Sequence, residues 1–306
     1  LEQRIFRGEV KMPLPCTGGH EVSGEIVALG DGVNKKMWAP GDRVAVRLLY
    51  NCGECYYCRT GHANLCERAQ KKPVREGLLI GPGGLCDYVI VNTGYLFKIP
   101  DTLSYEEASL TEPLACVVHS VTKANIQLGE DVVVIGGGIM GQYHVMLAKR
   151  RGARVIMSEV DESRRALARK LGADITFNPM EKDPVEYVKS LTEGRGADVV
   201  FNTTAIPSVV PQAIAMTGKA GRMIQYSSMH PDAPAPVSPQ MLHGNEPILT
   251  GSISPDVHDF FTANRLLSSG IIDCKPLIAK KFPFEQAQQA FEAAIVPGTF
   301  RVIITD

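Results

Sequence analysis

The chain has 306 residues, of which 44% are hydrophobic and 21% are charged, so it is long enough to build two globular domains with buried cores. Its formal net charge is -1, with lysine and arginine scattered along the chain, which argues against nucleic acid or an anionic membrane as a partner. No stretch approaches the roughly 20 apolar residues that span a bilayer, and no leader-like segment opens the chain, so we expect a cytoplasmic protein.

The first hundred residues contain short β-type runs separated by glycine and proline. These runs are EVSGEIVALG (21–30), DRVAVRLL (42–49), CDYVIVN (86–92) and LFKIP (96–100). Short runs with this punctuation are typical of antiparallel strands joined by turns. The pattern predicts a small β-barrel or sandwich.

Beyond residue 131 strands alternate with helical stretches. The strand runs are DVVVI (131–135), ARVIMS (153–158), DITFN (174–178), ADVVFN (197–202), GRMIQYS (221–227) and PILTGSI (247–253). This rhythm predicts a doubly wound parallel α/β sheet. We expect a first domain over 1–116, a second over 117–253, and a segment over 254–306 that returns to complete the first.

A glycine-rich turn follows the first of these strands directly. GGGIMG places Gly136, Gly138 and Gly141 in the order G-x-G-x-x-G, ahead of a helical run. The first glycine allows a tight turn, the second lets backbone approach a pyrophosphate, and the third permits close packing of helix on strand. The motif, with Ile139 and Met140 inside it, predicts a dinucleotide site, although a glycine-rich turn without a ligand is the alternative.

An acidic residue ends the next strand. Glu159 lies 23 positions beyond Gly136, where a carboxylate accepts hydrogen bonds from an adenosine ribose and repels a 2′-phosphate. NAD is therefore expected rather than NADP. Asp161 is a less favoured hydrogen-bond acceptor for the ribose. Arg164 or Arg165 would retain some affinity for phosphate, so Arg164 is included in the predicted coenzyme site.

Four cysteines lie within one short loop. Cys52, Cys55, Cys58 and Cys66 have the spacing C-x2-C-x2-C-x7-C, which suits a tetrahedral, structural zinc ion with no open coordination position. An iron–sulfur cluster is the competing interpretation, weakened because the fourth cysteine is too distant and no proline follows it. Free thiols without a metal are the remaining alternative.

A second group of metal-binding residue types lies elsewhere. His20 and Glu21 begin a β-type run, and Glu112 precedes a helical stretch near the expected domain boundary. Histidine and carboxylate together hold zinc while leaving a coordination position for a substrate. Taken singly, each is more typical of a polar loop or of a helix start, so the prediction depends on their combination.

These motifs resemble the zinc-dependent medium-chain dehydrogenases, the superfamily of alcohol, sorbitol and threonine dehydrogenases. The resemblance covers essentially the whole chain and rests on the order of GGHEVSGEI, GDRVAV, the four-cysteine lobe, EPLACVVH and VVVIGGGIMG. It implies a GroES-like β-barrel catalytic domain built from both chain ends, and a Rossmann domain between them. It also implies that His20 binds a catalytic zinc, that Glu112 binds the zinc or its water, and that Glu21 can coordinate in its place.

The sequence departs from that family at its beginning. The family's first catalytic ligand is a cysteine in a C-G-[ST]-D turn, whose serine or threonine relays the alcohol proton, and this turn would lie just before Leu1. Either the sequence is a fragment of a longer protein or the catalytic metal site is incomplete. We expect a fragment, because loss of the first strand would leave unpaired edges in the barrel. Cys16 is a poor geometric substitute for the missing ligand because it lies only four residues before His20.

The resemblance predicts NAD-linked interconversion of a secondary alcohol, polyol or related hydroxy compound and its ketone. One zinc would be structural and one catalytic, and the family suggests a homotetramer or homodimer. Two alternatives remain open: a zinc-independent reductase of the same superfamily, and a non-catalytic sensor or structural protein that binds a nucleotide and zinc.

Overall fold

The computed structural model describes most of the chain. The described residues are 2–9, 11, 13, 15–69, 79–230 and 232–305. They divide into two compact units, the first formed by residues 1–116 and 254–306 and the second by residues 117–253. Each unit is described by itself.

The first unit contains a three-stranded antiparallel sheet in the order β1-β2-β3. The strands are β1 (Glu21–Glu25), β2 (Arg43–Arg47) and β3 (Leu96–Lys98). Alternate residues of β2 point to one face, where Val44 and Val46 are buried in a cluster with Ile26 and Leu48. This cluster is the local hydrophobic core beneath the sheet.

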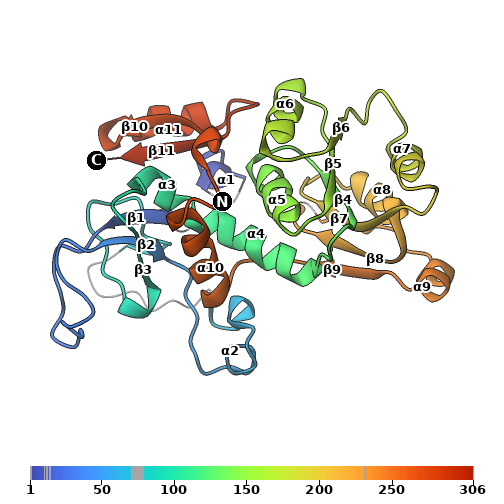
Figure 1. Ribbon diagram of the computed structural model, residues 1–306. Helices are drawn as coiled ribbons and strands as arrows, with labels where there is room; N and C mark the ends of the chain where they lie inside the picture. Colours follow the sequence, from blue (N-terminus) through green and yellow to red (C-terminus); the bar gives the residue numbers. More distant parts are fainter. Residues whose placement is uncertain are drawn as a thin grey trace. The chain divides into compact units, whose positions relative to one another are not determined.

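A second, two-stranded sheet in the first unit comes from the end of the chain. Strand β10 (Ile278–Pro283) pairs in parallel with β11 (Arg301–Thr305), and helix α11 (Ala287–Ala294) connects them (Figure 1). The other helices of this unit are α1 (Glu2–Phe6), α2 (Tyr56–Arg59), α3 (Tyr105–Ser109) and α10 (Val257–Ser268), with 3₁₀ turns η1 (Ala63–Leu65), η3 (Thr93–Tyr95), η4 (Lys275–Leu277) and η5 (Phe284–Gln286). Reciprocal capping bonds start α3 at Ser104 and α10 at Asp256.

The second unit is a six-stranded parallel sheet in the order β6-β5-β4-β7-β8-β9, which confirms the predicted doubly wound fold. Its strands are β4 (Asp131–Ile135), β5 (Arg154–Ser158), β6 (Ile175–Phe177), β7 (Ala197–Asn202), β8 (Thr217–Gln225) and β9 (Ile248–Gly251). Its helices are α5 (Ile139–Arg150), α6 (Glu162–Leu171), α7 (Pro184–Leu191), α8 (Val209–Met216) and α9 (Pro239–Asn245), preceded by α4 (Thr111–Ala124), which starts in the first unit. Helices α5 and α6 lie on one face of the sheet, and α7 and α8 lie on the other (Figure 1).

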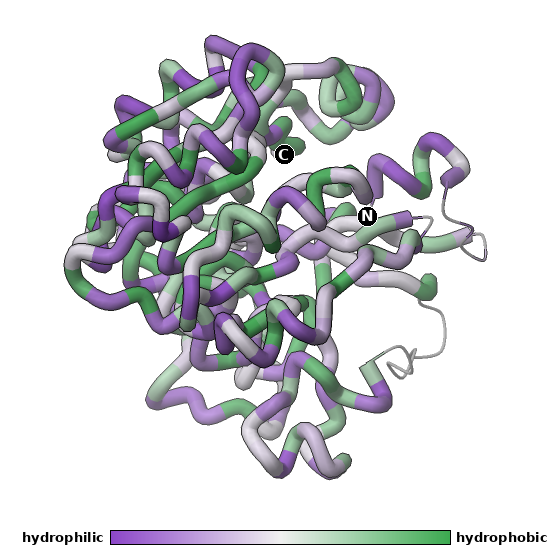
Figure 2. Tube along the Cα trace, turned by 90° about the vertical axis from the view of Figure 1, so that its right-hand side faces the viewer, coloured by the Kyte–Doolittle hydropathy of each residue, from purple (hydrophilic) through white to green (hydrophobic). Residues whose placement is uncertain are grey.

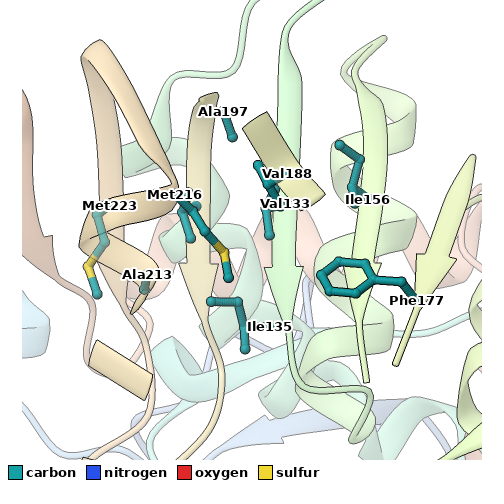
Figure 3. Packing of buried hydrophobic residues seen from close by; sticks show 10 residues of the cluster. Val133, Ile135, Ile156, Phe177, Val188, Ala197, Ala213, Met216 and Met223 are labelled. Atoms are coloured by element: carbon teal, nitrogen blue, oxygen red, sulfur yellow. The ribbon is translucent and has the colours of Figure 1, made fainter. Parts of the chain in front are cut away.

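Apolar side chains fill the space between the sheet and helices α7 and α8 (Figure 3). The buried members are Val133, Ile135, Ile156, Phe177, Val188, Ala197, Val200, Ala213, Met216 and Met223. Each large side chain buried in this way contributes roughly 1.5–3 kcal/mol to folding, so this layer holds the strand ends rigidly.

The order of the strands reverses between β4 and β7. Chain connections leave these two neighbouring strands in opposite directions, and ligands of such sheets bind beyond the carboxyl ends of the strands at this point. The turn that begins at Gly136 follows β4, and Thr203 follows β7. The predicted dinucleotide motif is therefore at the switch point of the sheet.

The predicted strand over 86–92 is wrong. Residues 86–92 form no strand within the described part of the chain, although Val89 and Val91 pack against the cluster beneath the first sheet and Ile90 is 66% exposed. Alternating burial is thus present without a hydrogen-bonded ladder. The sequence pattern correctly indicated which side chains pack inward. It could not indicate whether the backbone of this segment has a hydrogen-bonding partner in a sheet.

Helices long and apolar enough to cross a membrane are absent from the described residues. Figure 2 shows that the hydrophobic stretches of the trace are short and interrupted by hydrophilic ones.

Candidate metal and dinucleotide sites

The four cysteines of the lobe converge in the first unit. Their sulfur atoms all lie within 4.8 Å of one another, with Sγ of Cys52 4.0 Å from that of Cys58, and Sγ of Cys55 3.9 Å from that of Cys66. A tetrahedral zinc ion with Zn–S bonds of about 2.3 Å requires sulfur atoms about 3.8 Å apart. The spacing therefore fits one zinc ion.

Backbone amides of the lobe also stabilise thiolate. The amide of Cys52 donates to Sγ of Cys66, and the amide of Cys55 donates to Sγ of Cys52. Backbone hydrogen bonds from Cys58 and Glu67 lower the pKa of Cys55 to about 6. A thiolate is the form that binds metal, and these amides favour it at Cys55, whereas burial raises the pKa of Cys58.

His20, Glu21 and Glu112 are brought together from two distant parts of the sequence. One possible ligand atom from each lies within 4.8 Å of the other two. His20 directly precedes β1, Glu21 is its first residue, and Glu112 lies in the first turn of α4, where its side chain is buried. One nitrogen and two carboxylates at this spacing are a donor set that suits zinc.

Each of these three side chains has a neighbour that holds it. Nδ1 of His20 donates to Oε1 of Glu2 at 2.8 Å, which leaves Nε2 as the nitrogen available to a metal ion. Oε1 of Glu2 also accepts from the amide of Gly19 at 3.0 Å. The side chains of His20 and Glu2 are 22% and 20% exposed, so this contact is largely shielded from solvent.

Partners also hold both glutamates. Nη2 of Arg301 lies 2.7 Å from Oε1 of Glu21, and Sγ of Cys116 donates to Oε1 of Glu112 at 3.4 Å. Cys116 lies one helical turn after Glu112, so the two side chains share a face of α4. These three candidate ligands are thus oriented by groups outside the set.

Burial and the neighbouring carboxylates shift the pKa values of His20 and Glu112. Burial alone would lower the pKa of His20, but the hydrogen bond that His20 donates to Glu2 and the charge of Glu112 raise that pKa to about 9. Burial raises the pKa of Glu112 to about 7, against the opposing charge of His20. A metal ion that binds His20 would therefore displace a proton at neutral pH.

The glycine motif of the second unit is shaped by close contacts. Gly136 has a φ of 98°, and a Cβ on Gly141 would lie 1.8 Å from the carbonyl oxygen of Gly136, so both positions require glycine. A Cβ on Gly138 would meet nothing within 4 Å. Gly138 caps α5, whose first amides, beginning at Ile139 and Met140, have no acceptor within the helix and suit phosphate.

Glu159 lies beside this turn and is almost completely buried. Its Oε2 accepts a hydrogen bond from the amide of Gly137, and its Oε1 accepts one from the amide of Asp161 at 2.8 Å. The carboxylate thus joins the glycine turn to the loop after β5. Each carboxylate oxygen has a second lone pair, so acceptor capacity for a ribose remains.

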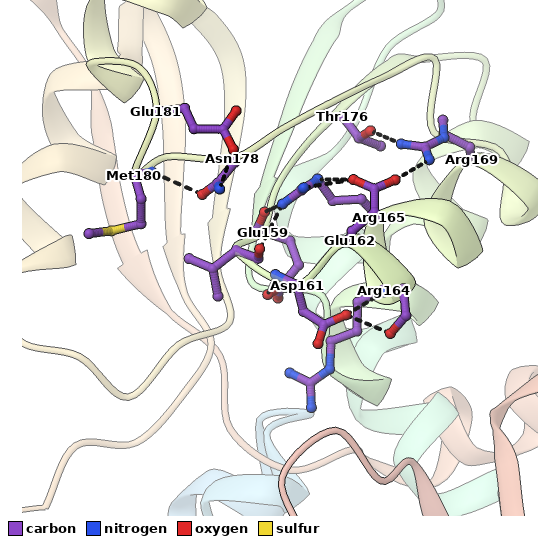
Figure 4. Close-up of polar contacts among 12 residues, drawn as sticks. Glu159, Asp161, Glu162, Arg164, Arg165, Arg169, Thr176, Asn178, Met180 and Glu181 are labelled. Atoms are coloured by element: carbon purple, nitrogen blue, oxygen red, sulfur yellow. Dashed lines mark hydrogen bonds and ion pairs between the residues drawn. The ribbon is translucent and has the colours of Figure 1, made fainter.

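The two neighbouring arginines differ in what they contact (Figure 4). Nη1 of Arg165 donates to the carbonyl oxygens of Glu159 and Val160, at 2.6 and 2.8 Å, while its Nη2 pairs with Glu162 at 2.7 Å. Arg165 therefore braces the loop after β5 and is not available for a phosphate. The guanidinium of Arg164 points away from this network (Figure 4).

Two protein families match this chain, one at its beginning and one mostly in its second half. The family described as "Alcohol dehydrogenase GroES-like domain" matches residues 1–101, and that described as "Zinc-binding dehydrogenase" matches residues 140–269. D-arabitol-phosphate dehydrogenase of Enterococcus avium is 34% identical over 305 residues, which cover 98% of this chain and 84% of that protein. The chain belongs to the zinc-dependent medium-chain dehydrogenase superfamily.

Solved structures agree with this dehydrogenase in fold. A candidate zinc-binding dehydrogenase of Sinorhizobium meliloti 1021, bound to NADP, has a TM-score of 0.89 at 29% identity and covers 99% of this chain and 88% of that one. A short-chain alcohol dehydrogenase of Escherichia coli CFT073, complexed with NADH, has a TM-score of 0.87 at 25% identity and covers 100% and 88%. The dehydrogenase is an oxidoreductase of alcohols or polyols.

Sequence reasoning did not find the residues that support the sites of this dehydrogenase. Glu2 and Arg301 hold His20 and Glu21, but no local spacing links either residue to its partner. No sequence pattern indicated the role of Gln142 either, whose Nε2 donates to the carbonyl oxygen of Gly137 at 3.0 Å. A usable signal was present only for Cys116, which is one helical turn from Glu112.

Proposed function

We propose that this dehydrogenase uses zinc and NAD to interconvert a secondary alcohol or polyol and its ketone, with His20, Glu21 and Glu112 as the catalytic metal ligands. The observation that carries the proposal is the convergence of these three side chains, with ligand atoms within 4.8 Å of one another. Three protein ligands with room for another are typical of catalytic rather than structural zinc.

The second metal site is assigned to Cys52, Cys55, Cys58 and Cys66. Four thiolates saturate a tetrahedral ion, so this site would stabilise the lobe and would not bind substrate. Sulfur distances of 3.9 and 4.0 Å support a single zinc ion held by all four. Thiolates must stay reduced to bind it, which favours a reducing compartment such as the cytoplasm.

The coenzyme site is assigned to Gly136, Gly138, Ile139, Met140 and Gly141 with Glu159 and Arg164. The first amides of α5 would bind the pyrophosphate, and Glu159 would accept from the ribose and repel a 2′-phosphate. The burial of Glu159 and the use of Arg165 in bracing the loop support NAD. Arg164 would lie near the adenosine end of the coenzyme.

In the proposed reaction zinc supplies Lewis acidity and NAD supplies the hydride acceptor. The chain's own residues bind and orient. Glu2 keeps the imidazole of His20 in one tautomer, and Arg301 offsets part of the negative charge that Glu21 brings to the site. Burial raises the pKa of Glu112 to about 7 in the metal-free site, and the charge of a bound zinc ion would hold its carboxylate in the ionised form.

Metal counting with two variants tests the assignment. His20→Ala should abolish NADH formation and remove one of two zinc ions per chain, because it deletes the single nitrogen ligand. Cys58→Ser should remove the other zinc ion and lower the melting temperature. One zinc ion in the wild-type protein, or turnover that survives His20→Ala, would instead favour a sensor or a zinc-independent reductase.

We also infer that the dehydrogenase forms a homodimer or homotetramer. Strand β9 is at the edge of the six-stranded sheet, and Ile248 on it and Ile253 after it are 56% and 63% exposed. An apolar edge strand is suited to pairing with a second copy of itself. Light scattering of the wild type and of Ile248→Lys would test this, since the variant should be monomeric.

A further inference from the structure

The hydroxyl group of Thr203 contacts the turn that follows β4. Oγ1 of Thr203 lies 2.8 Å from the carbonyl oxygen of Ile135 and 3.1 Å from that of Gly136, and it donates to this pair. A hydroxyl has one proton, so the two carbonyls share it. The side chain that follows β7 therefore holds the last residue of β4 and the first glycine of the motif.

The same hydroxyl fills the space beside two motif glycines. A Cβ on Gly136 would lie 2.9 Å from Oγ1 of Thr203, and a Cβ on Gly141 would lie 3.2 Å from it. A side chain at Gly136 would collide with this hydroxyl and with Cγ2 of Thr204, whereas one at Gly141 would first meet the carbonyl oxygen of Gly136. Thr203 thus lies directly against both glycines of the motif.

A chain of buried amides fixes the segment that carries Thr203. The amide of Thr203 donates to the carbonyl of Ile135 at 3.0 Å. Oδ1 of Asn202, which is completely buried, accepts from the amide and the hydroxyl of Thr204 at 3.1 and 2.8 Å. Nδ2 of Asn202 donates to Oε1 of Gln225 at 2.9 Å, which ties the loop to β8.

The rest of the glycine turn is held in the same way. The amide of Gly137 donates to Glu159, and the carbonyl of Gly137 accepts from Gln142. With the carbonyl of Gly136 held by Thr203, the polar backbone groups at the start of the turn have partners. The amides at the start of α5 are then the ones directed to a ligand.

We propose that Thr203 is a positioning residue for the coenzyme, whose hydroxyl fixes the glycine turn in the geometry that receives the pyrophosphate. The inference rests on the proposed dinucleotide function of this turn. Preorganisation strengthens binding because the turn need not be ordered when the coenzyme arrives. The hydroxyl touches no reacting atom and acts only through the turn.

Thr203→Val tests the proposal, since valine keeps the shape of threonine and removes the hydroxyl. The variant should bind NADH about 3- to 10-fold more weakly, the effect of one hydrogen bond. The KM for NAD should rise by the same factor while kcat at saturating NAD stays within about twofold. Backbone amides of residues 136–141 should also exchange deuterium faster in the coenzyme-free protein.

Two further variants separate positioning from general stability. Thr203→Ser keeps the hydroxyl and should restore wild-type NADH affinity. Thr217→Val is the matched control, because Oγ1 of Thr217 donates to the carbonyl of Ala213 at 2.9 Å, away from the motif, and it should leave affinity unchanged. If Thr203→Val fails to fold, Thr203→Ala carries the same comparison.

The outcomes are distinct. Wild-type NADH affinity in Thr203→Val, or equal losses in Thr203→Ser and Thr203→Val, would overturn the positioning role. A wild-type protein that does not bind NADH at all would instead overturn the proposed function.

Discussion

Arg301 and Glu21 come from opposite ends of the chain and form an ion pair, with 2.7 Å between Nη2 and Oε1 and side chains only 24% and 19% exposed. Glu21 is therefore shared between a guanidinium and the proposed metal site. The guanidinium offsets part of its negative charge and orients the carboxylate, the role that a neighbour outside a metal site has toward a ligand.

Removing this partner should change the metal site more than the fold. Arg301→Gln should lower the free energy of unfolding by about 1–3 kcal/mol, since one charged hydrogen bond is lost. It should also leave Glu21 without the partner that orients it, so that a chelator removes zinc faster and kcat falls. Arg301→Lys keeps the charge and should lie between the wild type and Arg301→Gln. Equal zinc retention in all three proteins would contradict this account of Glu21.

Coenzyme preference should depend on the charge of Glu159. Glu159→Gln keeps an acceptor for one of the two amides that the carboxylate now binds, and removes the charge that repels a 2′-phosphate. The ratio of kcat/KM for NADP to that for NAD should rise about tenfold, which corresponds to about 1.4 kcal/mol. Glu186→Gln is the matched control, because Glu186 pairs with Lys189 on α7, away from the glycine motif. An equal rise of this ratio in the control would show that the preference follows the net charge of the protein and not the position of Glu159.

Stability of the second unit should fall in mild acid because of His144. This side chain is completely buried, with Nδ1 2.8 Å from the carbonyl of Met140 and Nε2 2.9 Å from Oγ of Ser120. A carbonyl only accepts, so Nδ1 carries the proton and Nε2 accepts from the serine. Burial lowers the pKa of His144 from 6.5 to about 4.

The sign follows from proton counting. Between about pH 6.5 and pH 4 the unfolded chain binds a proton at His144 that the folded chain does not, so stability is complete above this window and is lost as the pH falls through it. The loss amounts to about 3 kcal/mol at most. The free energy of unfolding, measured with urea at several pH values in this range, should fall less steeply with decreasing pH in His144→Asn. This variant keeps a donor to the carbonyl of Met140. The exposed His243→Asn should retain the wild-type slope.

The sequence predicted those parts of the molecule that are encoded by dense local patterns. The glycine motif occupies six consecutive residues after an apolar strand, and the six parallel strands repeat at regular intervals. The four cysteines similarly lie within one short loop. Each pattern depends on neighbours in the chain, so its physical meaning can be worked out without a fold.

Long-range contacts could not be predicted in this way. Glu2 and Arg301 have no sequence relationship to His20 and Glu21, because only the fold brings them together. The segment 86–92 failed for a related reason: alternation reports burial, whereas a strand also needs a partner. Spacing selected Glu159 as a candidate, but it did not indicate that its carboxylate already accepts from the amide of Gly137.

Two alanine substitutions within the glycine motif should differ in their effect on stability while both weaken coenzyme binding. Gly138→Ala places its Cβ where nothing lies within 4 Å, at a φ of −65° that alanine accepts, so the melting temperature should stay within about 2 °C. Gly141→Ala places its Cβ 1.8 Å from the carbonyl oxygen of Gly136, and overpacking against backbone should cost about 1–3 kcal/mol or more.

Coenzyme binding should nevertheless be lost in both proteins. The added methyl of Gly138→Ala occupies the space through which a pyrophosphate approaches the backbone, so NADH should bind at least about tenfold more weakly to a fully folded protein. In Gly141→Ala the turn itself is displaced, and affinity and stability should fall together. Thermal melting and NADH titration of the two variants check this contrast. Wild-type affinity in Gly138→Ala would place the pyrophosphate elsewhere. The added methyl group meets no atom of the described residues within 4 Å, so it can weaken binding only by contact with the ligand.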